Sequence, residues 1–95
     1  MRNDHLPVEW RPAATADLEA IFAYVLPVNP FAAEQVVQAL TIAADSLATF
    51  PHRGRPGRVR DTRELVAIWP YILVYEVRDN VLSILRIWHG AQDRL

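Results

Sequence analysis

Three polar side chains stand out among the apolar, strand-like runs in the second half of the chain: Arg63, Arg86 and His89. Arginines can stabilise the charge that builds on phosphorus during phosphoryl transfer, and an imidazole can transfer protons near neutral pH. Each residue also has a structural interpretation. Arg63 beside Glu64 is typical of a surface ion pair, and a histidine at a strand end is commonly a hydrogen-bonded structural residue. The three residues are therefore candidates for catalysis that do not form a complete motif.

Arg86 lies between two apolar residues of a predicted strand, so its guanidinium requires a partner. Glu76 on the neighbouring strand is the expected one, as a cross-strand ion pair. Contact with a target molecule is the alternative interpretation.

A second basic group precedes these strands, in a segment whose glycines and prolines predict a loop over residues 52–58. The alternating Gly and Pro residues are expected to hold the arginines apart and exposed. The group is either a solvated loop or a contact surface for nucleic acid or for acidic groups of a protein. Its members are Arg53, Arg55, Arg58 and Arg60.

The 95 residues predict a single domain spanning 1–95, and a hydrophobic content of 52% argues against disorder. The net charge is only −1, but its distribution is uneven. Residues 1–50 hold two arginines and six acids, whereas residues 51–95 hold eight arginines and five acids. All basic side chains are arginine, which suits phosphate, carboxylate and aromatic partners, although a genomic composition bias gives the same pattern.

Several classes of protein fit the sequence poorly. The chain has no cysteine, and His5, His52 and His89 lack the spacing of metal ligands, so neither a metal nor another cofactor is expected. No Gly-x-Ser-x-Gly motif of a nucleophilic hydrolase occurs. The sequence shows no signal peptide and no membrane-spanning apolar run, so a cytoplasmic location without a membrane partner is expected.

Apolar periodicity predicts two amphipathic helices that follow a short strand at residues 6–10. The first helix begins at Pro12 and stops before Pro27. The second has Asn29 as its N-cap and Pro30 at its first position, and it is expected to end near residues 50–51. Their short connection predicts an antiparallel helical hairpin.

Three strands are expected next, near residues 59–68, 71–78 and 81–88, with Asp79-Asn80 as a tight hairpin turn. Tyr71 and Tyr75 are expected to share one face of the middle strand. Because both faces of the strands are apolar, the helices should cover one face, and a partner or the chain's own termini should cover the other. The fold class is α+β in the order β-α-α-β-β-β, with a mainly antiparallel sheet.

This order and its motifs resemble the RelE/ParE superfamily, the toxins of bacterial type II toxin–antitoxin systems. The resemblance covers nearly the whole chain and is carried by Ala-x-x-Asp-Leu-x-x-Ile at 14–21, Leu-x-x-x-Pro-x-x-Gly at 47–54, Thr-Arg-Glu-Leu at 62–65, Pro-Tyr-x-x-x-Tyr at 70–75 and Arg-x-x-His-Gly-Ala-Gln at 86–92. It implies a toxin that a cognate antitoxin neutralises. Trp69 and Trp88 would then be core residues or face the antitoxin.

The resemblance leaves two targets open, besides a non-toxic protein-binding module. RelE-type toxins cleave mRNA on the ribosome, and that activity would use Arg63, Arg86 and His89. In that branch an arginine normally follows the first tyrosine of Pro-Tyr-x-x-x-Tyr, where this chain has Ile72. ParE-type toxins bind DNA gyrase and need no catalytic residue. The motifs look closer to the ParE branch, with the loop arginines, Arg63, Arg86 and His89 as candidates for contact with target or antitoxin.

Overall fold

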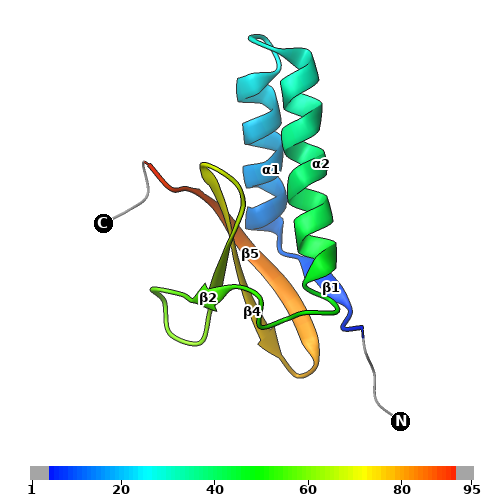
Figure 1. Ribbon diagram of the computed structural model, residues 1–95, viewed down its shortest axis with the longest axis vertical. Helices are drawn as coiled ribbons and strands as arrows, with labels where there is room; N and C mark the ends of the chain where they lie inside the picture. Colours follow the sequence, from blue (N-terminus) through cyan, green and yellow to red (C-terminus); the bar gives the residue numbers. More distant parts are fainter. Residues whose placement is uncertain (1–4, 92–95) are drawn as a thin grey trace.

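The computed structural model describes residues 5–91, which form two layers, a helical hairpin and one sheet (Figure 1). The helices are α1 (Pro12–Val25) and α2 (Pro30–Ser46), and the closed end of their hairpin extends beyond the sheet. Each helix begins with a proline, whose fixed φ suits a first helical position that needs no N–H. The predicted α+β class and helical hairpin are confirmed.

The boundaries of α2 show one correct and one wrong expectation. Asn29 is the N-cap, and its Oδ1 accepts a hydrogen bond from the Ala32 backbone N at 3.1 Å. The helix ends at Ser46 rather than near residue 50. Its last turn tightens, because the backbone N–H groups of Leu47 and Ala48 donate three residues back, to Ala44 and Asp45.

The sheet has five strands in the order β1-β5-β4-β3-β2. The strands are β1 (Val8–Trp10), β2 (Arg55–Pro56), β3 (Arg63–Ile68), β4 (Tyr71–Arg78) and β5 (Val81–His89). β1 runs parallel to β5, and all other neighbours are antiparallel. The first and last described strands therefore lie side by side, with β4 and β5 at the centre of the sheet.

Two strand expectations need correction. The strand expected from residue 59 starts only at Arg63, because residues 59–62 form a turn that the hydrogen bond from Thr62 Oγ1 to the Val59 carbonyl closes. The segment expected as a loop contains the short edge strand β2. The hairpin turn is confirmed, because Asp79 and Asn80 have φ angles of 55° and 62°, as a two-residue turn between β4 and β5 requires.

The core lies between the helices and one face of the sheet. Tyr71 and Tyr75 both pack on this side, as expected, and Tyr75 is fully buried. The opposite face is also apolar at its centre, with Ile72 and Val74 buried. The main residues of the core between helices and sheet are Ala14, Leu40, Ala44, Leu47, Leu73, Tyr75, Leu82 and Ile84.

Candidate functional site

The segment that carries the candidate arginines is anchored on the hydroxyl group of Tyr75. This hydroxyl donates to the Pro51 carbonyl at 2.7 Å and accepts from the Gly54 backbone N at 2.9 Å. Gly54 is buried here, and a Cβ atom on it would lie 2.8 Å from the Tyr75 oxygen and 2.9 Å from the Glu64 carbonyl oxygen. Burial raises the pKa of Tyr75 above its ordinary value, although the Gly54 bond and nearby arginines oppose the shift. The neutral hydroxyl thus fixes the start of the loop.

Glu64 fixes the other end of this segment. Its side chain is 3% exposed and accepts from Arg55 Nη2 at 3.1 Å and from the Arg58 backbone N at 2.9 Å. Burial alone would raise the pKa of Glu64, but the Arg58 backbone bond, the Arg55 bond and both guanidinium charges outweigh it and lower the pKa. The expected surface pair of Glu64 with Arg63 is wrong, because alternation along β3 sends the two side chains to opposite faces of the sheet.

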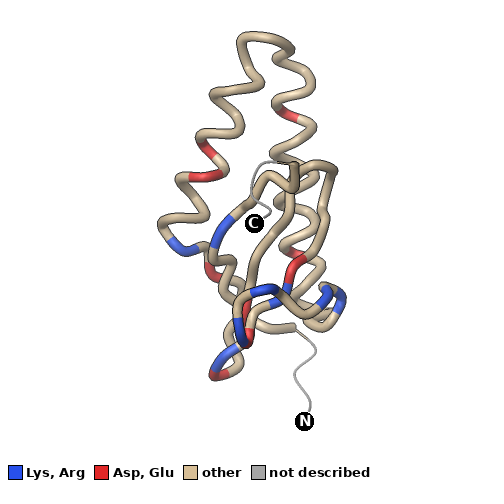
Figure 2. The backbone as a smooth tube through the Cα atoms, turned by 90° about the vertical axis from the view of Figure 1, so that its left-hand side faces the viewer, with Lys and Arg blue, Asp and Glu red and all other residues tan. Residues whose placement is uncertain are grey.

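All four loop arginines are exposed residues, as the sequence predicted, but intramolecular contacts orient them. Arg53 Nη1 donates to Ser46 Oγ at 2.8 Å, and the Arg58 guanidinium lies 4.6 Å above the centre of the Trp88 ring. The Arg60 side chain is 95% exposed, and its Nε lies 4.0 Å from Asp61 Oδ2. Figure 2 shows most of the arginines gathered at this part of the chain, while the only charged residues of the two helices are acidic.

Arg86 pairs with Asp17 of α1, and the predicted partner Glu76 is wrong. Arg86 Nε donates to Asp17 Oδ2 at 2.7 Å and Nη2 donates to Oδ1 at 3.1 Å, which is a bidentate contact. Asp17 Oδ2 also accepts from the Ile87 backbone N at 2.9 Å. Glu76 instead lies opposite Ser83 and makes an ion pair with Arg78 at 3.5 Å.

A hollow lies between α1 and the ends of β4 and β5. Its larger part, about 360 Å³, is lined by Ala20, Ile21, Tyr24, Tyr71 and His89. A smaller part of about 200 Å³ reaches Asp17 and Arg86 and shares Ala20, Ile21, Tyr71 and His89. The rings of Tyr71 and His89 meet edge to face with 5.5 Å between their centres. Arg86 and His89 therefore line one pocket, and the carboxylate of Asp17 lies in it as well.

Arg63 is not part of this pocket. It lies opposite Tyr75, and its Nη1 donates to the Gly54 carbonyl at 2.6 Å. The intervening strand β4 separates β3 from β5 by about 10 Å. The structure thus divides the three candidate catalytic residues between two places. Ile72, at the position where RelE-type nucleases carry an arginine, is 3% exposed and adds no charge.

Sequence reasoning missed Asp17 and Glu64 as organising residues. Asp17 was visible only within the Ala-x-x-Asp-Leu-x-x-Ile motif, and nothing in its local sequence indicates a partner on the last strand. A glutamate close to several arginines is a signal that could have suggested the role of Glu64.

Within residues 5–91, no group of three or more His, Cys, Asp or Glu side chains is arranged to hold a metal ion. Neither helix in this range is long and apolar enough to span a membrane.

A comparison with protein families identifies the family of this chain. The model of a family described as ParE toxin of type II toxin-antitoxin system, parDE, matches residues 8–94. The chain belongs to the ParE toxin family. Among curated proteins, members similar to this ParE-family chain include Toxin RelE2 of Caulobacter vibrioides, with 44% identity over 90% of this chain and 96% of the relative. Putative toxin Y4kP of Sinorhizobium fredii is 42% identical over 90% of this chain and 88% of its own length.

Solved structures agree with this assignment. A chain of the chromosomal ParDE system from P. aeruginosa superposes with a TM-score of 0.82 at 27% identity, covering 92% of this chain and 98% of that one. A chain of the toxin-antitoxin complex RelBE2 from Mycobacterium tuberculosis gives a TM-score of 0.70 at 24% identity, covering 96% of this chain and 98% of that one. This second likeness supports the fold alone. The ParE-family chain is thus a toxin of a type II toxin–antitoxin system by family.

Proposed function

We propose that this ParE-family toxin acts by binding DNA gyrase, without cleaving RNA, and that a cognate antitoxin neutralises it. The observation that carries the proposal is the pairing of Arg86 with Asp17. RNA cleavage would need the Arg86 guanidinium, but both oxygens of the Asp17 carboxylate already bind it. The similar chain from P. aeruginosa belongs to a ParDE toxin–antitoxin system, which supports an antitoxin partner.

The chemistry of RNA cleavage argues for the same conclusion. Cleavage requires a cationic group at the phosphorus centre and a proton donor or acceptor within hydrogen-bond reach of the reacting oxygens. Arg86 is neutralised by Asp17, and Arg63 is directed at the Gly54 carbonyl on another part of the sheet. Of the three candidate residues, His89 would remain for proton transfer.

A binding toxin needs only an exposed, complementary surface. The loop arginines provide one, because Arg53, Arg55, Arg58 and Arg60 are all exposed residues at one end of the sheet. Their positive charge suits acidic groups on gyrase. Arg60, with a side chain 95% exposed, loses the least by turning toward a target.

Ribosome-dependent mRNA cleavage of the RelE type is the second candidate function. The pocket that joins Tyr71, Arg86 and His89 favours it, because it places an imidazole and a guanidinium in one hollow. A third candidate, a non-toxic protein-binding module, predicts that expression of the chain without an antitoxin leaves growth unchanged.

One paired experiment separates the two toxin activities. Purified gyrase is assayed for supercoiling and for trapped cleaved DNA in the presence of the chain, while total RNA from arrested cells is sequenced. We expect inhibited supercoiling, cleaved DNA and intact mRNA. His89→Ala should leave this inhibition unchanged, whereas Arg60→Glu should weaken it. Codon-phased mRNA cuts that disappear with His89→Ala, with supercoiling untouched, would establish the RNase instead.

A further inference from the structure

An aromatic and apolar surface lies on the face of the sheet opposite the helices. Val66, Ile72 and Trp88 are successive partners across β3, β4 and β5, so their side chains lie in one row on one face. Their neighbours Leu65, Leu73 and Ile87 pack toward the helices. Because side chains alternate along a strand, the row of Val66, Ile72 and Trp88 faces the other way.

Trp69 extends this row at the turn between β3 and β4. A Cβ atom on Gly90 would lie 2.9 Å from Trp69 Cζ3 and 3.2 Å from Ile72 Cδ1, so the indole ring covers Gly90 beside Ile72. We call the surface formed by Arg58, Val66, Trp69, Ile72 and Trp88 the tryptophan face. Its members come from three strands, one turn and one loop.

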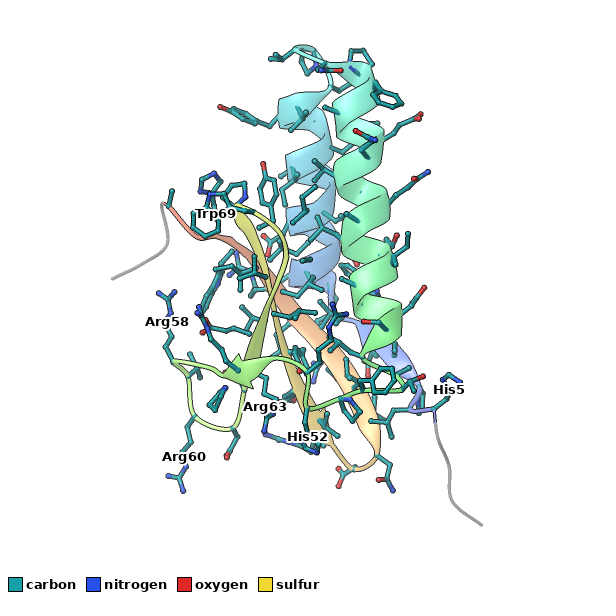
Figure 3. All side chains as sticks on the ribbon, in the orientation of Figure 1. His5, His52, Arg58, Arg60, Arg63 and Trp69 are labelled. Carbon is teal, nitrogen blue, oxygen red and sulfur yellow. The ribbon has the colours of Figure 1, made fainter. Side chains whose placement is uncertain are left out.

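The tryptophan face is accessible and has the composition of a binding hot spot. Trp69 is 67% exposed and Val66 is 46% exposed, so both side chains are open to a partner. Arg58 lies 4.6 Å above Trp88 and completes the surface. Trp69 and Arg58 project from the side of the sheet away from the helices (Figure 3). Tryptophan and arginine are enriched among the residues that dominate binding energy at protein interfaces.

The charge around this surface specifies the chemistry of the partner. The segment of residues 53–63 holds five arginines and a single acid, Asp61, whereas residues 12–46 hold four acids and no base. Glu64 compensates only part of this charge, since it meets both Arg55 and Arg58. The rim of the tryptophan face is therefore positive, and an acidic partner is complementary to it.

We propose that the tryptophan face is the docking surface for an extended, acidic segment of the antitoxin. One aliphatic or aromatic side chain of that segment packs against Trp69 and Val66, and its carboxylates approach Arg55, Arg58 and Arg60. The inference rests on the proposed toxin function, because it assumes the antitoxin partner. Since the loop arginines are also the proposed contact with gyrase, an antitoxin bound here would cover them.

A nucleic acid is a poorer match for the same surface. Bases bind by stacking on open aromatic faces, and Arg58 already covers one face of Trp88. Phosphate binding draws on many uncompensated cations, whereas Glu64 offsets part of the charge of Arg55 and Arg58. RNA binding is retained as an outcome of the test.

The test measures affinity for the antitoxin encoded beside this toxin, by titration calorimetry with full-length proteins. Trp69→Ala is expected to weaken binding by about 30-fold, as for a hot-spot residue. The matched control is Phe31→Ala, which removes an aromatic ring that is 69% exposed on α2 and is expected to change affinity less than about threefold. Arg60→Glu should weaken binding at low salt and reduce its salt dependence.

Val66→Asp provides a second variant, and circular dichroism of each variant confirms that it is folded. If Trp69→Ala and Val66→Asp bind like the wild type, the inference is overturned, and weaker binding by Phe31→Ala would place the antitoxin on the helical hairpin instead. If Trp69→Ala loses binding to single-stranded RNA but keeps the antitoxin affinity of the wild type, the surface binds nucleic acid and the inference is overturned. Failure of the wild-type chain to bind the antitoxin would count against the proposed function itself.

Discussion

Asp17 and Arg86 lie 69 positions apart in the sequence and meet through two hydrogen bonds, at 2.7 and 3.1 Å. β1 pairs only with Leu82, Ser83 and Ile84 of β5. The contact joins α1 to the part of β5 that lies beyond this pairing. Where β1 ends, the Asp17 carboxylate replaces it as a hydrogen-bond acceptor for β5, because it also accepts from the Ile87 N–H. The pair therefore continues the edge of the sheet with a side chain.

We expect Asp17→Ala to destabilise the fold by about 1–3 kcal/mol, because it leaves the Ile87 N–H without its acceptor. Arg86→Ala should cost less, about 1 kcal/mol, since Asp17 keeps its backbone bond and the Arg86 side chain is 51% exposed. Urea denaturation of both variants and of the double variant measures the coupling. Equal costs for the two single variants would show that the ion pair matters more than the backbone bond.

Tyr75→Phe tests the anchor of the arginine loop. The change removes two hydrogen bonds and leaves the buried Gly54 N–H and the Pro51 carbonyl without a partner, so a loss of about 2 kcal/mol is expected. Chemical denaturation gives the stability, and hydrogen exchange at Gly54 should accelerate. Tyr24→Phe is the control, and its hydroxyl is expected to contribute nothing measurable because the residue is 78% exposed.

Glu64 should make stability depend on pH in the acid range. Its pKa in the folded protein is lowered from the ordinary value of 4.5, so the unfolded chain binds its proton more readily. The stabilisation is complete above about pH 4.5 and is lost as the pH falls through the lower folded pKa. Glu64→Gln should lower stability by about 1–3 kcal/mol at pH 7.

The measurement for Glu64 is the difference in unfolding free energy between wild type and Glu64→Gln, followed from pH 7 to pH 3. We expect the difference to shrink below about pH 4.5. A difference that stays constant over this range would mean that the carboxylate charge contributes nothing. Glu34→Gln, on the exposed side of α2, serves as the control for a general effect of charge.

Asn80 tests the turn between β4 and β5. Its φ of 62° lies in the left-handed region, which costs most residues with a Cβ atom about 1 kcal/mol, whereas Asn, Asp and the Cβ-free Gly adopt it more readily. Asn80→Ala should therefore lower the melting temperature by a few degrees, since about 1 kcal/mol corresponds to about 4–8 °C in a domain of this size. Asn80→Gly should keep or raise it, and the opposite order would contradict this account.

The sequence predicted the features that depend on neighbouring residues. Asn29-Pro30 specifies the start of α2, and Asp79-Asn80 specifies a turn whose positive φ angles few other residues adopt. Apolar periodicity over residues 14–25 was sufficient to predict an amphipathic helix there. These signals are local, so a single sequence contains them in full.

The features that sequence reasoning missed depend on distant parts of the chain. The partner of Arg86 was sought on the adjacent strand, but an irregularity between Val74 and Tyr75 shifts the register, and a helix supplies Asp17 instead. The edge strand β2 is held by Tyr75, which binds Gly54 before it, and by Glu64, which binds Arg55 within it and the Arg58 backbone after it. The division of Arg63 from Arg86 and His89 likewise follows from strand order.

The parallel pairing of β1 with β5 has a consequence for synthesis. β5 bonds to β1 on one side and to β4 on the other, and it is made after every other described element. On the ribosome, the helical hairpin and the earlier strands thus have no complete sheet to close on until residues 81–89 have emerged. The tryptophan face and the pocket lined by His89 form together, in a late and cooperative step, so a partly synthesised chain is unable to present them.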